Sequence, residues 1–234
     1  MIQRLVPFVL LLAACEGGGG GPVPLSELSP VYAEVSCAKI FECCTQEEIM
    51  MQFEALGDPP TNEAECRAFL GGFLSLGTSQ LMMSEAAGRI RYDADMAGAC
   101  ADSVRDVSCA EYRGGFSPMG SGATCDAVIV PLVEVGGACS QDQECTTGNC
   151  ERTGSDDGQC APLPAMGEDC TFDCVEGLYC GFDGMSRTCQ PTKADGEECD
   201  GDGECQSERC AGGDPAMGVP GTCSSGGGDG ICGG

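Results

Sequence analysis

The stretch CSQDQEC at residues 139–145 recurs as CDGDGEC at residues 199–205, so both follow the pattern C-x-x-D-x-E-C. Between them lies a shortened version, CTFDC, at residues 170–174. Each opening cysteine is the last residue of a G-x-x-C step. The first and second opening cysteines are 31 residues apart, and the second and third are 29 residues apart. The glycines of these steps are Gly136, Gly167 and Gly196. A period near 30 residues indicates an internal repeat of three units.

Each unit adds three further cysteines after the opening one: Cys145, Cys150 and Cys160; Cys174, Cys180 and Cys189; Cys205, Cys210 and Cys223. Cys125 precedes the first unit as Cys160 and Cys189 precede the next two. Only ten Val, Leu, Met, Phe or Tyr residues lie between Cys139 and Cys223. Burial at ~25 cal/mol per Å² from so few side chains does not offset an ordering cost of ~1.5 kcal/mol per residue. We therefore expect disulfides to hold residues 125–223 in irregular repeats with short hairpins, and residues 127–135 to be the best strand candidate.

The cysteine count favours disulfides over metal ligation. The chain has 21 cysteines, of which Cys15 belongs to an N-terminal export motif. The other 20 are enough for ten bridges, and the sequence leaves their connectivity open. The chain contains no C-x-x-C or C-x-C spacing of the kind that zinc sites use, so no metal site is expected. The vicinal pair Cys43-Cys44 has a redox alternative, but bridges to two different partners are the preferred interpretation. The expected disulfide cysteines are Cys37, Cys43, Cys44, Cys66, Cys100, Cys109, Cys125, Cys139, Cys145, Cys150, Cys160, Cys170, Cys174, Cys180, Cys189, Cys199, Cys205, Cys210, Cys223 and Cys232.

The N-terminus predicts export. A positively charged start at residues 1–4 is followed by an apolar run at residues 5–12, too short to span a bilayer. The run ends in LAAC at residues 12–15, which resembles the bacterial lipobox. The resemblance implies a signal peptide at residues 1–14 and lipidation of Cys15. Five consecutive glycines and two prolines follow, so residues 15–30 are expected to form a Gly/Pro-rich tether. The alternative is an ordinary secretory signal that leaves Cys15 as a free thiol.

Residues 31–113 are expected to form a disulfide-stapled helical bundle. Ser29-Pro30 predicts the start of a first helix, Asn62 with Glu65 the start of a second, and Asp93 the start of a third. Helical spacing predicts that the buried faces carry Val31, Val35, Ala38, Phe41 and Cys44; Cys66, Phe69, Leu70, Phe73 and Leu74; and Met96, Ala97, Cys100, Val104 and Val107. The six cysteines of this region are enough for three internal bridges. The methionines Met50, Met51, Met82, Met83 and Met96 are interpreted as core filler rather than as a ligand groove.

Composition excludes several classes of function. With 37 acidic and 11 basic residues the formal charge is −26, which opposes binding to nucleic acids. The absence of histidine removes the usual general base, and the chain has no nucleophile-elbow or phosphate-loop motif, so neither an enzyme nor a cofactor is expected. An acidic cluster is read as a solvated turn, with weak calcium binding as the alternative. Its members are Asp195, Glu197, Glu198, Asp200, Asp202 and Glu204.

The C-x-x-D-x-E-C step followed by Gly148-Asn149-Cys150 resembles the Dickkopf N-terminal cysteine-rich region. Together with the lipobox and the helical part, it is similar to uncharacterised cysteine-rich lipoproteins of myxobacteria. The resemblance implies a disulfide-rich fold and a place at the outer membrane or cell surface, and it does not imply the signalling role of the animal family. Partners expected on this basis are the membrane, through the lipid, and an extracellular protein or glycan. A structural envelope protein without a ligand is the alternative, and residues 224–234 are expected to be a Gly-rich tail.

Overall fold

The computed structural model describes residues 20–54, 59–113, 123–152, 158–171, 173–182, 184–213, 218–225 and residue 232. The expected signal peptide, Cys15 and the first part of the expected tether lie outside these residues, as does most of the expected tail. The described chain has a helical N-terminal region, small antiparallel hairpins and ten disulfides.

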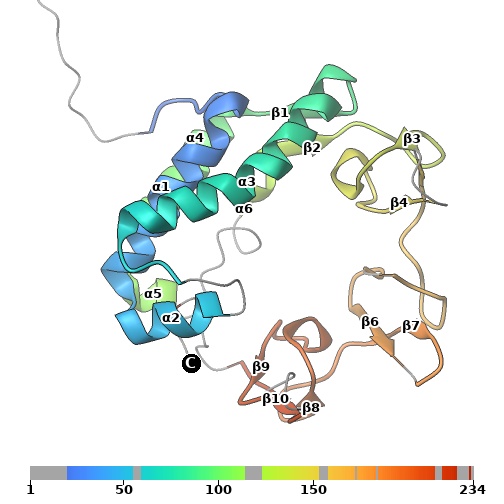
Figure 1. Cartoon of the computed structure of the whole chain (residues 1–234). Coiled ribbons are helices and arrows are strands. Elements are labelled where there is room, and N and C mark those ends of the chain that lie inside the picture. The colour runs from blue at the N-terminus through green and yellow to red at the C-terminus, as the bar shows by residue number, and fades with distance from the viewer. Residues whose placement is uncertain are drawn as a thin grey trace, which may run out of the picture.

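The helical region is built around helix α1, Leu28–Cys43, which packs against α3, Glu63–Ala86, and α4, Ala94–Asp106 (Figure 1). Three shorter helices complete it: α2, Gln46–Glu54, α5, Cys109–Arg113, and α6, Ala123–Asp126. Its main core contains Cys37, Ile40, Ile49, Phe53, Cys66 and Tyr112, with the rings of Phe53 and Phe69 edge to face. This region therefore has a hydrophobic core in addition to its disulfides.

Two of the three expected helix starts are confirmed. The Asn62 side-chain oxygen accepts a hydrogen bond from the Glu65 amide at 3.0 Å, and the Asp93 side-chain oxygen accepts one from the Met96 amide at 3.1 Å. These caps satisfy amides that have no partner within their own helices.

The expected cap at Ser29 is wrong. A 3₁₀ turn, Leu25–Glu27, runs directly into α1, so the helix begins at Leu28 and Ser29 lies inside it. The buried Ser29 hydroxyl instead lies 2.5 Å from the Thr78 hydroxyl of α3. A side chain that faces a neighbouring helix is not available to cap its own.

The predicted buried faces are correct only in part. Ala38 is exposed, because α1 contacts both α3 and α4 and therefore buries a broader and rotated arc that includes Ala33, Cys37 and Ile40. Phe73 is also exposed. Of the methionines interpreted as core filler, only the half-buried Met96 packs against a core cluster, whereas four are exposed: Met50, Met51, Met82 and Met83.

The strand candidate at residues 127–135 is shorter than expected. Strand β2, Ile129–Pro131, pairs antiparallel with β1, Ile90–Tyr92, with Tyr92 opposite Ile129. Three residues pair because β1 itself has only three. Beyond β2 the chain turns away, and Val133 forms a parallel bridge with Cys145.

The three units repeat the same backbone hydrogen bonds. The amides of the step glycines Gly136, Gly167 and Gly196 donate to the carbonyls of the fourth cysteines, Cys160, Cys189 and Cys223, at 2.7, 2.9 and 2.8 Å. Each of these glycines has a positive φ, between 79° and 91°, a conformation that residues with a Cβ rarely adopt. The G-x-x-C step is thus the turn that starts each unit. We call residues 136–160, 167–191 and 196–223 unit 1, unit 2 and unit 3.

The strands of the units are short. Unit 1 contains β3, Ala138–Cys139, β4, Cys150–Glu151, and β5, Gly158–Cys160; unit 2 contains β6, Leu178–Phe182, and β7, Arg187–Pro191; unit 3 contains β8, Glu198–Cys199, β9, Cys210–Ala211, and β10, Gly221–Cys223. All of these strands pair antiparallel within their own unit. Short 3₁₀ turns, Asp142–Glu144 and Asp202–Glu204, carry the acidic residues of the repeated motif.

Disulfide connectivity is identical in the three units: the first cysteine pairs with the third and the second with the fourth. The pairs are Cys139–Cys150, Cys145–Cys160, Cys170–Cys180, Cys174–Cys189, Cys199–Cys210 and Cys205–Cys223. The buried cluster of unit 3 consists of Cys199, Cys205 and Cys223, with Cys210 packed against it. Half-cystines therefore take the place of a hydrophobic core there.

The remaining four bridges correct one expectation. Only Cys37–Cys66 and Cys43–Cys109 join two of the six cysteines of the helical region. Cys100 instead pairs with Cys125, which the sequence had grouped with the repeats, and Cys44 pairs with Cys232. The vicinal cysteines do bridge to two different partners, as expected. The Cys44–Cys232 bridge, with a sequence separation of 188, ties the C-terminal end of the curved row of units back to α1 (Figure 1).

A glutamate occupies a glycine position in unit 3. Gly148 in unit 1 and Gly177 in unit 2 follow the second cysteine by three residues and have positive φ. The equivalent Glu208 has φ 52°, the only positive value among the described non-glycine residues, and its side chain is exposed.

We expect Glu208→Gly to stabilise unit 3 by about 0.5–1 kcal/mol, because it relieves the left-handed conformation while adding some freedom to the unfolded chain. Hydrogen exchange at the Glu208 amide, which donates to the Cys205 carbonyl, provides the measurement. Gly148→Ala in unit 1 is the matched control and should have the opposite sign. Equal exchange in wild type and Glu208→Gly would show that the backbone there is not strained.

Candidate binding groove

The aspartate of the repeated motif closes a loop within its unit. In unit 1 the Asp142 carboxylate accepts a hydrogen bond from the Cys150 amide at 2.8 Å. In unit 3 the equivalent Asp202 accepts one from the Cys210 amide at 2.7 Å. The aspartate therefore satisfies the amide of the third cysteine, which explains its place in the pattern.

The glutamate of the motif has a second structural task. Glu144 accepts a hydrogen bond from the Ser140 amide at 2.6 Å, and Glu204 accepts one from the Asp200 amide at 3.1 Å. Each glutamate also faces a cation: the guanidinium of Arg89 lies 3.4 Å from Glu144, and the ammonium of Lys193 lies 2.5 Å from Glu204. The repeated acidic side chains thus hold their own turns in place.

The same explanation covers much of the acidic cluster that was considered for calcium. The Glu197 carboxylate accepts a hydrogen bond from the Ala194 amide at 2.5 Å. A hydrogen bond with Ser225 lowers the pKa of Asp195. With Asp202 and Glu204 also hydrogen-bonded, these carboxylates favour the interpretation as an acidic turn rather than as a cation site.

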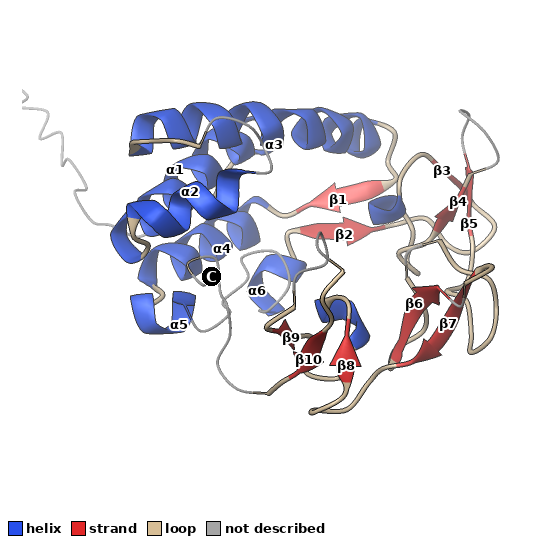
Figure 2. Ribbon diagram, turned by 60° about the horizontal axis from the view of Figure 1, so that its bottom comes forward, coloured by secondary structure: helices blue, strands red, loops and turns tan. Residues whose placement is uncertain are grey.

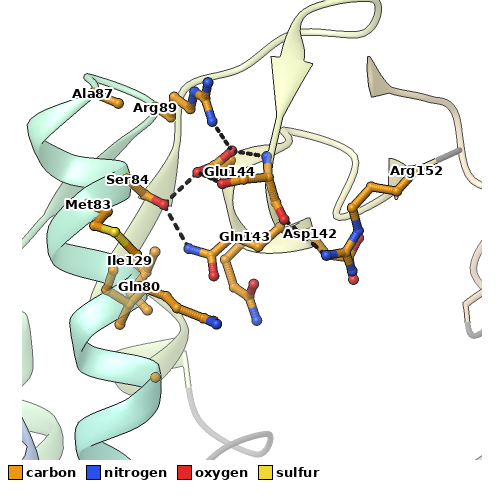
Figure 3. Close-up of a pocket in the computed structure, with 14 residues that line it drawn as sticks. Gln80, Met83, Ser84, Ala87, Arg89, Ile129, Asp142, Gln143, Glu144 and Arg152 are labelled. Carbon is orange, nitrogen blue, oxygen red and sulfur yellow. Dashed lines mark hydrogen bonds and ion pairs between the residues drawn. The ribbon is translucent and has the colours of Figure 1, made fainter. Parts of the chain in front are cut away.

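Glu144 differs from Glu204 because it is fully buried where unit 1 meets the helical region (Figure 3). The hydroxyl of Ser84 in α3 donates to it at 2.5 Å, and the Ser140 hydroxyl donates at 2.8 Å. The Arg89 guanidinium lies 3.4 Å away, and the Gln141 amide donates to the Ser84 hydroxyl at 2.8 Å. This network fixes unit 1 against the C-terminal end of α3.

The network also sets the protonation of Glu144. Burial raises the pKa of this carboxyl, but hydrogen bonds from Ser84 and Ser140 and the charge of Arg89 together lower it, so the net pKa lies below its ordinary value of 4.5. The carboxylate is therefore ionised at neutral pH, as a buried acceptor of several hydrogen bonds is expected to be.

Beside this network lies a cleft with a volume of about 780 Å³. One wall is α3, with Gln80 and Met83, and the other is the loop of unit 1 that carries Gln143 and Arg152 (Figure 3). Leu81 and Ile129 add apolar surface. Within the described part of the chain, the side chains of Gln80 and Gln143 make no hydrogen bond. Both amides are therefore available to a ligand.

A second hollow of about 430 Å³ continues from the first, between units 1 and 2. The two hollows share Asp142 and Arg152 in their linings, and together we call them the groove. The second hollow is acidic, with Glu151, Asp169 and Asp173 in its lining. No aromatic ring belongs to the described residues that line either hollow. The groove therefore offers amides, the guanidiniums of Arg89 and Arg152, and carboxylates, which suit a polar and extended ligand.

Several cysteine sulfurs lie close enough together to suggest metal ligands. In each unit three sulfurs fall within 4.8 Å of one another, as in the set Cys139, Cys145 and Cys160. All of them belong to disulfides, and a disulfide sulfur lacks the thiolate charge that zinc requires. These sets are consequently explained by the crossed bridges of each unit.

The sequence pointed to Glu144 and Asp142 through their motif, but the groove around them was missed. Ser84, Arg89 and Arg152 belong to no motif, and only the docking of unit 1 on α3 brings them together.

Among the described residues, no helix has both the length and the apolar character needed to cross a bilayer. No family model, no curated protein and no solved structure matches the chain.

Proposed function

We propose that this chain is an exported, lipid-anchored and non-enzymatic recognition protein that binds an extracellular partner in the groove. The lipobox-like LAAC at residues 12–15 supports export and lipidation of Cys15, and the resemblance of the units to Dickkopf-like repeats of bacterial lipoproteins supports an envelope location. The disulfide-rich units require an oxidising compartment, which export provides.

The observation that carries the binding proposal is the groove with its fixed walls. Unit 1 is held by two disulfides of its own and by the Glu144 network, so the positions of Gln143 and Arg152 are set before a ligand arrives. A preorganised site avoids most of the ordering cost of binding.

Among the two expected partner classes, the groove favours a polypeptide over a glycan. Sugar rings commonly stack on aromatic side chains, and the described groove lining has none. Its unpaired side-chain amides match the hydrogen-bonding groups of a peptide backbone, and its acidic end matches a basic side chain. The partner we propose is therefore an extended, neutral-to-basic segment of an extracellular protein.

Photo-crosslinking in intact cells tests this proposal. A p-benzoylphenylalanine in place of Gln143 is expected to give one discrete protein adduct, whereas the same replacement of Gln52 should give none. Gln52 is an exposed glutamine of α2, the helix that lies across the molecule from β3 and β4 of unit 1 in Figure 1. Arg152→Glu is expected to reduce the Gln143 adduct at least tenfold. A glycan adduct would move the partner to the other class. Diffuse adducts from both positions would instead support a structural envelope role without a specific ligand.

A further inference from the structure

Residues 20–24, which fall within the expected tether, are docked on helix α4 in the structure. The Val23 amide donates a hydrogen bond to the Ala94 carbonyl at 2.9 Å. The Val23 carbonyl accepts one from the Tyr92 hydroxyl at 2.7 Å, and the Val23 side chain is buried in a core cluster that includes residues of α4. Backbone that is hydrogen-bonded and buried in this way belongs to the folded region. We call residues 20–24 the strap.

The strap crosses α4 at a glycine. A Cβ placed on Gly98 would collide with the Gly21 carbonyl oxygen, so a larger residue at this position would push the strap away from the helix. Beside this crossing, the Gly20 amide donates a hydrogen bond to the Asp102 carboxylate at 2.7 Å. The strap is therefore held by backbone hydrogen bonds and by a close approach that a side chain would block.

Docking of the strap leaves a short connection to the cysteine proposed for lipidation. Four residues, 16–19, separate Cys15 from Gly20. At ~3.6 Å per residue, the five steps from Cys15 to Gly20 span at most about 18 Å. If the strap were undocked, the ten steps from Cys15 to Leu25 would span up to about 36 Å. The strap therefore halves the greatest distance between a lipid on Cys15 and the folded helical region.

The strap begins on the side of the molecule that lies away from the groove. In Figure 1 the described chain starts in blue at the left, next to α4, whereas β3 and β4 of unit 1 and β6 and β7 of unit 2 lie at the right. The groove is formed by α3 with unit 1 and by units 1 and 2, so it opens on the right-hand side. A lipid on a short connection from the strap therefore places the bilayer on the opposite side.

From this geometry we infer that the docked strap holds the helical region beside a lipid bilayer and turns the groove toward the surrounding medium. The inference rests on the lipidation of Cys15 that is part of the proposed function. With a formal charge of −26, the chain offers no basic surface for anionic headgroups, so its distance from the bilayer is set by the covalent lipid and the strap. The partner of the groove therefore approaches from the side away from the membrane.

Energy transfer from a single tryptophan to dansyl-labelled lipid tests this arrangement in phosphatidylcholine vesicles that carry the lipidated full chain. The chain has no tryptophan of its own, so each substitution gives one donor. Ala99→Trp, at an exposed position of α4, is expected to transfer at least threefold more efficiently than Phe182→Trp on β6. Adding Gly98→Ala should at least halve the transfer from position 99. Gly72→Ala is the matched control, since a Cβ on this α3 glycine meets no atom within 4 Å, and it should leave the transfer unchanged.

Flotation with the vesicles separates the failure of this inference from the failure of the proposed lipidation. A chain that does not float contradicts the lipid anchor, and the inference falls with it. If the chain floats but positions 99 and 182 transfer equally, or if Gly98→Ala leaves the transfer unchanged, the anchor stands and the arrangement is wrong. Hydrogen exchange reports the strap directly: the Val23 amide should lose its protection in Gly98→Ala while α1 keeps its own. Retained protection at Val23 would show that the glycine crossing does not dock the strap.

Discussion

Replacing Cys205 and Cys223 together with serine is expected to unfold unit 3 while the helical region stays folded. The buried cluster of unit 3 consists of half-cystines alone, so the described residues of the unit, 196–213 and 218–223, form no other apolar interior. A bridge that closes a loop of this size, with a separation of 18 residues, contributes about 3 kcal/mol. Ordering the chain costs ~1.5 kcal/mol per residue, and the single remaining bridge does not offset it.

Hydrogen exchange measured by mass spectrometry reports this change locally. The amides of Gln206 and Cys223, which donate to Lys193 and Glu197 carbonyls, should lose their protection, and those of α1 should keep theirs. Cys37→Ser with Cys66→Ser is the matched control. That pair lies in a core with Ile40, Ile49 and Phe53, so its loss should cost about 2–4 kcal/mol without unfolding the helices. Persistent protection in unit 3 would mean that interactions other than disulfides hold it.

Glu144→Ala is expected to detach unit 1 from α3 at a cost of about 3–5 kcal/mol, since it leaves the buried hydroxyl of Ser84 and the cation of Arg89 without their carboxylate. The equivalent substitution in unit 3, Glu204→Ala, removes a partly exposed pair with Lys193 and should cost about 1 kcal/mol or less. Chemical denaturation followed by circular dichroism measures both. Similar losses for the two variants would contradict the special role of the buried glutamate.

The same contact should depend on pH. The pKa of Glu144 is lower in the folded protein than its ordinary value of 4.5, so its contribution to stability is complete above pH ~5 and is lost as pH falls through the folded pKa. Protection of the Val133 and Thr146 amides, which pair with Glu144 and Val133 carbonyls, is expected to fall in this acid range in the wild type. In Glu144→Gln the acid dependence from this site should be absent.

The repeat was visible in the sequence because each G-x-x-C step has a glycine with positive φ, and because Asp142 and Asp202 each accept a hydrogen bond from the amide of the third cysteine of their unit. These are local requirements, and they leave a visible pattern. The number of bridges was predicted separately, because 20 cysteines remain when Cys15 is set aside. The pairing order within a unit depends on which β strands meet, and spacing alone does not determine it.

Long-range contacts explain the failures. Ser29 was misassigned as a cap because its partner Thr78 is distant in sequence. The observed buried face of α1 is rotated from the predicted one because two helices, α3 and α4, pack on α1. The exposure of Phe73 and Met83 could not be read from periodicity, since an apolar stripe looks the same in the sequence whether it meets the core or solvent. The bridges Cys100–Cys125 and Cys44–Cys232 cross the boundary that the sequence placed between helices and repeats.

Disulfide mapping of the native protein, digested without reduction and analysed by mass spectrometry, tests most directly whether crossed bridges replace an apolar interior. In every unit we expect the first cysteine linked to the third and the second to the fourth, as in Cys199–Cys210 and Cys205–Cys223, together with Cys44–Cys232. Free thiols in the units, or neighbours joined in sequence order such as Cys199 to Cys205, would contradict the account.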